Sequence, residues 1–207
     1  MLITRFIINM ITHKKYILAS SSASRKRILT NCGFVFKQIA PTCDEEEIKK
    51  RINMENKPSA IAKMLSFEKA KSISIMKKYH SHYVIGCDTL IYLDKRIFDK
   101  AKTLKEAKSK IKKLSGKQHK IVSGLTVCYK GLSLWQCSET TIVKVRELSY
   151  FEIDTYLKKT GKRILKSVGC YQLESLGPQI IEEIKGDFFN VLGLPLFKLL
   201  KYVSLNK

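Results

Sequence analysis

The segment Tyr83–Leu93, with the sequence YVIGCDTLIYL, constrains the fold more than any other part of the chain. Apolar residues occupy both of its alternating sets of positions, a pattern typical of a β-strand that is buried on both faces. A lone carboxylate in such a strand is costly unless a metal, a cation or hydrogen bonds compensate it. Asp88 is therefore a candidate site residue. The alternative, that Asp88 ends the strand and caps a turn, is disfavoured by the apolar residues on both sides of it.

Strand and helix patterns alternate along the rest of the chain, which predicts a mixed α/β fold. The opening is an apolar strand at 16–19, a serine-rich turn at 20–24 and a helix at 25–32 that Gly33 ends. Further strands are predicted at 34–39, 119–129, 134–145 and 179–184. Further helices are predicted at 58–78 and after Pro195. Two more begin at capping boxes: one runs from the box of Thr103 and Glu106 to Leu114, and the other from the box of Ser149 and Glu152 to Gly161. Because no linker or repeat divides the chain, we expect a single domain over 16–207.

The composition is that of an ordinary globular protein except for its charge. Of the 207 residues, 44% are hydrophobic and 28% charged, which excludes a disordered chain and suits one domain, with room for two lobes. The formal net charge of +21 favours an anionic partner such as nucleic acid, a membrane surface or a phosphorylated small molecule. The basic residues are scattered, however, so a solvated lysine-rich surface explains the charge equally simply. We therefore expect no stable nucleic-acid partner.

The cysteines and the amino-terminal segment indicate a cytoplasmic protein. Six widely spaced cysteines without a C-x-x-C pair exclude a zinc finger and are expected to be reduced thiols. Residues 1–15 hint at a secretion signal, but polar residues break the apolar stretch and no cleavage site follows. We interpret them as an extension of unknown role, or as a segment upstream of a true start at Met10. No run of 18 apolar residues predicts a transmembrane helix, so no membrane partner is expected.

Two further segments carry groups suited to phosphate or metal chemistry. Asp44-Glu45-Glu46 forms a loop of hard oxygen ligands for Mg²⁺ or Mn²⁺, although such a run is usually a solvated surface. The turn Ser20–Arg25 joins a strand to a helix amino terminus, where N–H groups, hydroxyls and an arginine can converge on an anion. His119 is more simply a structural residue that follows a tight turn.

Seven motifs in order resemble those of the Maf family, the so-called septum-formation-inhibitor proteins, which are nucleotide pyrophosphatases. The resemblance covers about residues 16–203. The matching segments are Ile17–Arg25 (I-L-A-S-x-S-P-R-R), Asp44-Glu45 (D-E-T), Glu68–Ala70 (E-K-A), Gly86–Thr89 (G-x-D-T), Lys100 (G-K-P), Ser115–His119 (S-G-x-x-H) and Gly186–Pro195 (G-D-Y-x-N-V-V-G-L-P).

The resemblance implies a mixed, twisted sheet flanked by helices, with two lobes around a central cleft. Asp88 would be the catalytic carboxylate, as general base or ligand of a divalent metal (Mg²⁺ or Mn²⁺), and Glu45 the second acidic ligand. Lys69 and Lys100 would hold the triphosphate. The loop that binds its phosphates would be lined by Ser20, Ser22 and Arg25. The resemblance also suggests a homodimer, for which the residues themselves carry no signal.

Three positions are linked with base selection in the family, and two of them, Ser24 and Glu174, depart from its pattern. The positions concerned read Ser24, Thr89 and Glu174 here, where many members have Arg, Thr and Gln. This mixture matches neither the thymidine/uridine pattern nor the methylguanosine pattern, so the base preference stays open.

The function predicted from these residues is hydrolysis of nucleoside triphosphates, non-standard or excess ones, to the monophosphate and pyrophosphate. Metal-assisted attack of water at the α-phosphate would drive it. The alternative is a regulatory protein of cell division that acts through a protein or nucleic-acid partner. A third reading, a nonspecific nucleic-acid binder, does not explain the buried Asp88.

Overall fold

The computed structural model describes residues 14–51 and 57–206. Most of the predicted amino-terminal extension, residues 1–13, lies outside this range. The strands are β1 (Tyr16–Ala19), β2 (Phe36–Ile39), β3 (Tyr83–Leu93), β4 (Arg96–Phe98), β5 (Gln118–Tyr129), β6 (Leu132–Val145) and β7 (Ile181–Lys185). The helices are α2 (Ala23–Asn31), α3 (Glu45–Arg51), α4 (Pro58–Ser74), α5 (Leu104–Leu114), α6 (Tyr150–Thr160), α7 (Phe188–Val191) and α8 (Leu196–Leu205), with 3₁₀ turns η1 (Lys77–Tyr79), η2 (Gly161–Lys166) and η3 (Gly177–Gln179).

The described strands form one mixed sheet in the order β2-β1-β3-β5-β6-β7, with β4 paired to β3. β1 is parallel to both β2 and β3, whereas β3–β4 and β6–β7 are antiparallel. β3 is buried over most of its length, as its apolar sequence predicts. The predicted α/β fold with a mixed sheet flanked by helices is confirmed.

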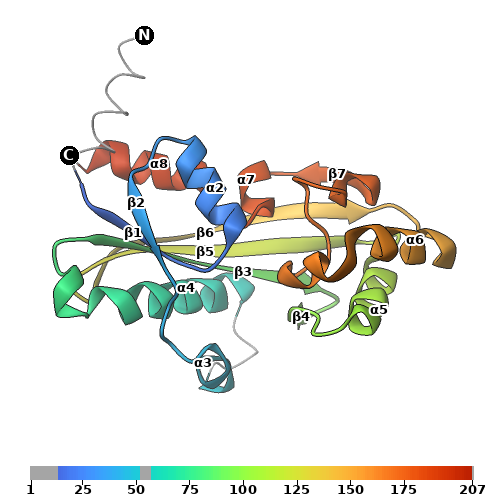
Figure 1. Ribbon diagram of the computed structural model, residues 1–207, viewed down its shortest axis with the longest axis horizontal. Helices are drawn as coiled ribbons and strands as arrows, with labels where there is room; N and C mark the ends of the chain where they lie inside the picture. The colour runs from blue at the N-terminus through green and yellow to red at the C-terminus, as the bar shows by residue number, and fades with distance from the viewer. Residues whose placement is uncertain (1–13, 52–56, 207) are drawn as a thin grey trace, which may run out of the picture. The chain divides into compact units, whose positions relative to one another are not determined.

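The chain divides into two compact units whose segments interleave along the sequence. The first contains the described residues up to Asp88, Ser123–Glu139 and those from Gly193 onward. Within this unit, α4 lies on one side of the strands and α2 with α8 on the other (Figure 1). Two glycines of the strands allow α4 to lie unusually close: a Cβ on Gly86 would be 2.2 Å from the Ser66 carbonyl oxygen, and one on Gly124 2.0 Å from that of Ala62.

The second unit contains Thr89–Val122 and Thr140–Leu192. Its apolar core is formed by the inner faces of α5, α6 and η2 and by parts of the strands, and it includes Ile111, Ile153 and Ile164. α6 begins at a complete capping box of Ser149 and Glu152, as predicted. The box predicted for α5 is only half formed, because Glu106 accepts the N–H of Lys102 instead of that of Thr103.

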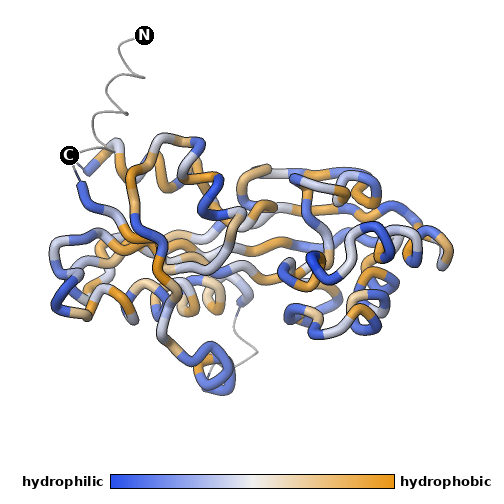
Figure 2. Tube along the Cα trace, viewed as in Figure 1, coloured by the Kyte–Doolittle hydropathy of each residue, from blue (hydrophilic) through white to orange (hydrophobic). Residues whose placement is uncertain are grey.

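The structure differs from the predicted elements in the lengths and number of helices. α4 ends at Ser74, where residues up to 78 were predicted, because Met76 adopts an extended backbone before η1 begins. The acidic segment, predicted as a loop, opens helix α3, none of whose residues is buried. This polar helix appears blue in Figure 2. In the part of the chain that the structure describes, no helix combines the length and apolar character needed to span a membrane.

Candidate functional site

An ammonium group lies between two carboxylates in the first unit. Lys69 Nζ is 2.5 Å from Asp88 Oδ1 and 3.0 Å from Glu45 Oε1. Lys69 and Asp88 are each only 7% exposed, whereas the Glu45 side chain is 43% exposed. Burying a carboxylate or an ammonium group costs several kcal/mol of desolvation free energy. The attraction within a close ion pair, with further hydrogen bonds, offsets roughly this cost. The predicted requirement of Asp88 for a compensating cation is thus met by Lys69.

The close approach of α4 to β3 sets this geometry. Gly86 lies two residues before Asp88, and the atoms nearest to its missing side chain belong to Ser66 and Ala70, which flank Lys69 on α4. Any larger residue at position 86 would push this turn of the helix away from the strand, since a real Cβ does not come within 3.0 Å of backbone atoms. Gly86 therefore determines how closely Lys69 approaches Asp88.

Glu45 reaches the site from the first turn of α3. Asp44 Oδ1 accepts hydrogen bonds from the N–H groups of Glu46 and Glu47, each at 3.0 Å, and so caps the helix. Acidic residues in the first turn and basic residues in the last favour the helix through its dipole. The prediction that this acidic segment is a loop is therefore wrong: Asp44 caps the helix, Glu46 is exposed in its first turn, and Glu45 contacts Lys69.

The serine-rich turn is fixed from within by its own side chains. Ser22 caps α2 by accepting the Arg25 N–H. Ser20 Oγ accepts both the Ser22 N–H and an Arg25 Nη1 donor, each at 3.2 Å. Arg25, buried with 9% exposure, also donates from Nε to the Gly193 carbonyl at 2.7 Å. Arg25 thus braces the loop by joining it to the segment that precedes α8.

The serine-rich turn and Asp88 lie at neighbouring strands of the sheet. β1 and β3 are parallel neighbours in which Ala19 pairs with Gly86, so Ser20 and Asp88 follow at the same edge. The Cys87 thiol also donates to the Gly193 carbonyl, with 3.1 Å between Sγ and the carbonyl oxygen. Burial raises the pKa of the Cys87 thiol, which therefore stays a neutral donor. Gly193 was not predicted as a site residue, because it lies 168 residues from Arg25 and only the fold brings them together.

The remaining predicted site residues have different surroundings. Ser24 is half-buried in the first turn of α2. Thr89 follows Asp88 in β3 as the first residue of the second unit and is half-buried. Lys100 and Glu174 are exposed residues of the second unit. Within residues 14–51 and 57–206, no group of three or more His, Cys, Asp or Glu side chains converges as metal ligands.

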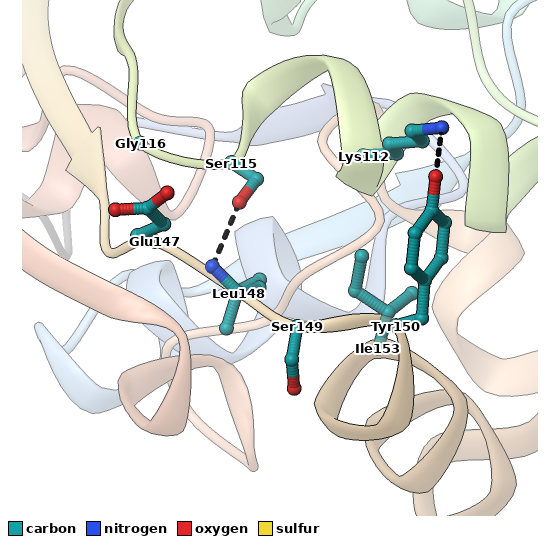
Figure 3. A pocket seen from close by; sticks show the side chains of 8 residues that line it. All are labelled: Lys112, Ser115, Gly116, Glu147, Leu148, Ser149, Tyr150 and Ile153. Carbon is teal, nitrogen blue, oxygen red and sulfur yellow. Dashed lines mark hydrogen bonds between the residues drawn. The ribbon is translucent and has the colours of Figure 1, made fainter.

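His119 and a surface hollow belong to the second unit. His119 Nε2 bonds the Tyr171 hydroxyl at 2.6 Å, and burial lowers the pKa of His119 to about 4, so the imidazole is neutral. This agrees with a structural role. A hollow of about 340 Å³ beside α5 and α6 is lined by Lys112, Ser115, Gly116, Glu147, Leu148, Ser149, Tyr150 and Ile153 (Figure 3). Ser115 accepts the Leu148 N–H there and Lys112 bonds the Tyr150 hydroxyl, so we assign the hollow no role.

The sequence matches known proteins over nearly its whole length. The family described as Maf-like protein matches residues 15–205. A Caulobacter vibrioides protein named nucleoside triphosphate pyrophosphatase is 38% identical over 190 residues, which cover 91% of this chain and 94% of that protein. A Rhizobium johnstonii protein named 7-methyl-GTP pyrophosphatase is 37% identical over 188 residues, covering 90% and 94%. A Legionella pneumophila protein named nucleoside triphosphate pyrophosphatase is 35% identical over 187 residues, covering 90% of each.

Proposed function

The chain belongs to the Maf family, and from that premise we propose that it hydrolyses nucleoside triphosphates to the monophosphate and pyrophosphate. The observation that most directly supports this activity is the buried Lys69 ammonium between the carboxylates of Asp88 and Glu45. A protein that only binds a partner has no need of such a costly buried cluster beside a serine-rich loop. The family predicted from the sequence motifs is confirmed.

A divalent metal fits the two carboxylates. Asp88 and Glu45 lie close enough together for the Lys69 ammonium to contact both, and a bound ion would share the two carboxylates with this ammonium. Mg²⁺ in phosphoryl-transfer sites commonly takes one or two protein carboxylates and completes its shell with substrate phosphates and water. Asp88 and Glu45 would hold the ion, which when bound neutralises phosphate charge and makes the α-phosphorus more electrophilic.

The chain's own residues supply positioning and proton transfer. Asp88 orients a water molecule toward the α-phosphorus and accepts its proton, while the bond to the pyrophosphate leaving group breaks. Lys69 compensates the charge of Asp88 and holds its carboxylate in place. The loop braced by Ser20, Ser22 and Arg25 receives the phosphates at the amino terminus of α2.

The remaining assignments belong to the same proposal. On the resemblance of their motifs alone, we assign Lys100 a part in triphosphate binding and Ser24, Thr89 and Glu174 a part in base selection. The substrates we propose are non-standard or excess nucleotides, and the name of the relative called 7-methyl-GTP pyrophosphatase supports the first class. We also propose that the enzyme acts in the cytoplasm without a stable nucleic-acid partner, and the family resemblance alone suggests that it can form a homodimer.

The test is pyrophosphate release from a panel of standard and modified nucleoside triphosphates, including 7-methyl-GTP, with Mg²⁺ or Mn²⁺. In Asp88→Asn we expect kcat to fall at least 100-fold, in the range typical of a lost general base. The matched control is Asp94→Asn, since Asp94 also pairs with a lysine, Lys117, but is exposed in a turn. Full activity in Asp88→Asn would refute the catalytic assignment. Release from no nucleotide by the wild type would favour the partner-binding alternative.

A further inference from the structure

Gln38 holds the serine-rich loop from the neighbouring strand β2. Its side-chain amide donates to the Ser20 carbonyl at 2.8 Å and to the Ser22 carbonyl at 3.2 Å. Both partners are acceptors, so both N–H bonds of the amide are used and only an NH₂ group serves at this place. Gln38 pairs with Leu18 in the parallel ladder of β1 and β2, which brings it alongside the turn that follows β1.

These two hydrogen bonds, with the bond from the Lys26 N–H to the Ser22 carbonyl at 3.1 Å, determine where two N–H groups of the loop point. In a trans peptide unit the N–H is directed opposite to the C=O. With the carbonyls of Ser20 and Ser22 turned toward Gln38, the N–H groups of Ser21 and Ala23 therefore point away from it. Ala23 is the first residue of α2, whose N–H has no acceptor within the helix.

Other N–H groups of the loop are already engaged. The Ser20 N–H bonds the Ile39 carbonyl at 3.0 Å, the Ser22 N–H bonds Ser20 Oγ, and the Arg25 N–H bonds Ser22 Oγ. The donors of Ser21 and Ala23 are thus the ones that Gln38 presents to an anion at the start of α2.

We propose that Gln38 is a positioning residue for the triphosphate, which holds two peptide units so that the N–H groups of Ser21 and Ala23 bind phosphate oxygens. The proposal rests on the proposed function and specifies which part of the loop recognises phosphate. The Gln38 side-chain amide donates to the loop and is assigned no contact with the phosphate. Without its amide, the Ser20 carbonyl loses the Gln38 bond, and its peptide unit can rotate so that a carbonyl oxygen rather than the Ser21 N–H meets the anion. The Ser22 carbonyl keeps the Lys26 N–H of α2 at 3.1 Å, so the Ala23 N–H is held less strictly by Gln38 than the Ser21 N–H is.

The test compares Gln38→Glu, which keeps the shape but removes both donors, with Gln136→Glu. The control glutamine also donates through its amide to a carbonyl, that of Lys63 at 2.9 Å, and to Thr126 Oγ1 at 3.0 Å, away from the loop. In Gln38→Glu we expect KM for the nucleotide and Kd for inorganic tripolyphosphate, measured by calorimetry, to rise about tenfold, the effect of one lost charge-assisted hydrogen bond. We expect kcat to stay within about threefold, and all three constants to stay near wild type in Gln136→Glu.

Gln38→Leu, which removes the donors without adding a charge, serves as the second variant and decides the matter if Gln38→Glu does not fold. The proposal is overturned if KM and tripolyphosphate Kd stay within about twofold of wild type in the folded variant. It is also overturned if Gln136→Glu raises them equally, since Gln38 would then act only through general stability. One further outcome is that the wild type binds tripolyphosphate with a Kd that the Gln38 variants raise, yet releases no pyrophosphate from any nucleotide. In that case the proposed function fails while this assignment stands.

Discussion

The burial of His119 makes the stability of the protein depend on pH. The side chain is 2% exposed and its folded-state pKa is about 4, against an ordinary value of 6.5. Between these values the unfolded chain binds a proton that the folded protein does not. We therefore expect the free energy of unfolding to be fully maintained above pH 6.5 and to fall as the pH drops toward 4. The contribution of His119 to this loss is about 3 kcal/mol. Urea unfolding at pH 7.5, 6.5, 5.5 and 4.5 measures it.

Other groups also titrate in this range, so the informative quantity is the difference between variants. His119→Gln removes the titration and is expected to be less stable at pH 7.5, because the bond to Tyr171 is altered, but to lose less stability on acidification. His82, whose pKa burial also lowers, gives the control His82→Gln. An equal slope in His119→Gln and wild type would show that the charging of His119 does not limit acid stability.

Single residues differ in how far the sequence reveals them. Asp88 stands out because it interrupts an apolar strand. Lys69 is one of 39 basic residues, and only the family motif selects it before the fold is known. Gln38 has no signal at all, because its role depends on the register between β1 and β2 and on carbonyls 16 and 18 residues away.

The close packing of helix α4 against the sheet affects both the stability of the fold and the position of Lys69. Gly86 and Gly124 both admit the helix backbone so closely that a methyl group would overlap it. We expect Gly86→Ala and Gly124→Ala each to destabilise the fold by about 1–3 kcal/mol, the usual cost of overpacking. Activity should separate them, because Gly86 faces the turn that carries Lys69 and Gly124 faces Ala62, two turns earlier.

Paired measurements of melting temperature and kcat distinguish the two variants. At a temperature where both are folded, Gly86→Ala is expected to lose at least tenfold in kcat and Gly124→Ala less than threefold. Equal loss of kcat in both would mean that the whole helix, rather than its turn at Lys69, shifts when the contact is widened.

Hydrophobic patterns predict β3 and α4, which bury apolar residues, and the capping box of Ser149 and Glu152 predicts α6. Hydrophobic periodicity could not predict α3, whose residues are all unburied and whose order comes from the Asp44 cap and from charge placement. β4 was missed for a related reason, since three residues are too few for a periodic pattern. α3, which carries Glu45, is one of the elements that periodicity does not detect, and for this reason the sequence predicts a loop at the acidic segment.

The net charge of +21 acts on the molecule as a whole. Excess like charge destabilises a compact state through self-repulsion and attracts an anionic substrate over long range. Raising NaCl from 0.01 M to 0.15 M shortens the screening length from about 30 Å to about 8 Å. We therefore expect the melting temperature to rise by a few degrees over this range, while kcat/KM for a nucleoside triphosphate falls.

The two salt effects have opposite signs because screening weakens both the repulsion within the protein and the attraction of the substrate. Anions bound at the phosphate loop would also raise the melting temperature, so a variant must separate this local effect from the global one. The combined change Lys158→Gln, Lys159→Gln and Lys162→Gln lowers the charge at three exposed positions of the second unit and leaves the loop intact. If self-repulsion dominates, this variant melts higher than wild type at 0.01 M NaCl and responds less to added salt. An unchanged salt response would assign the stabilisation to anion binding at the loop, and the lysine-rich surface would then be energetically neutral.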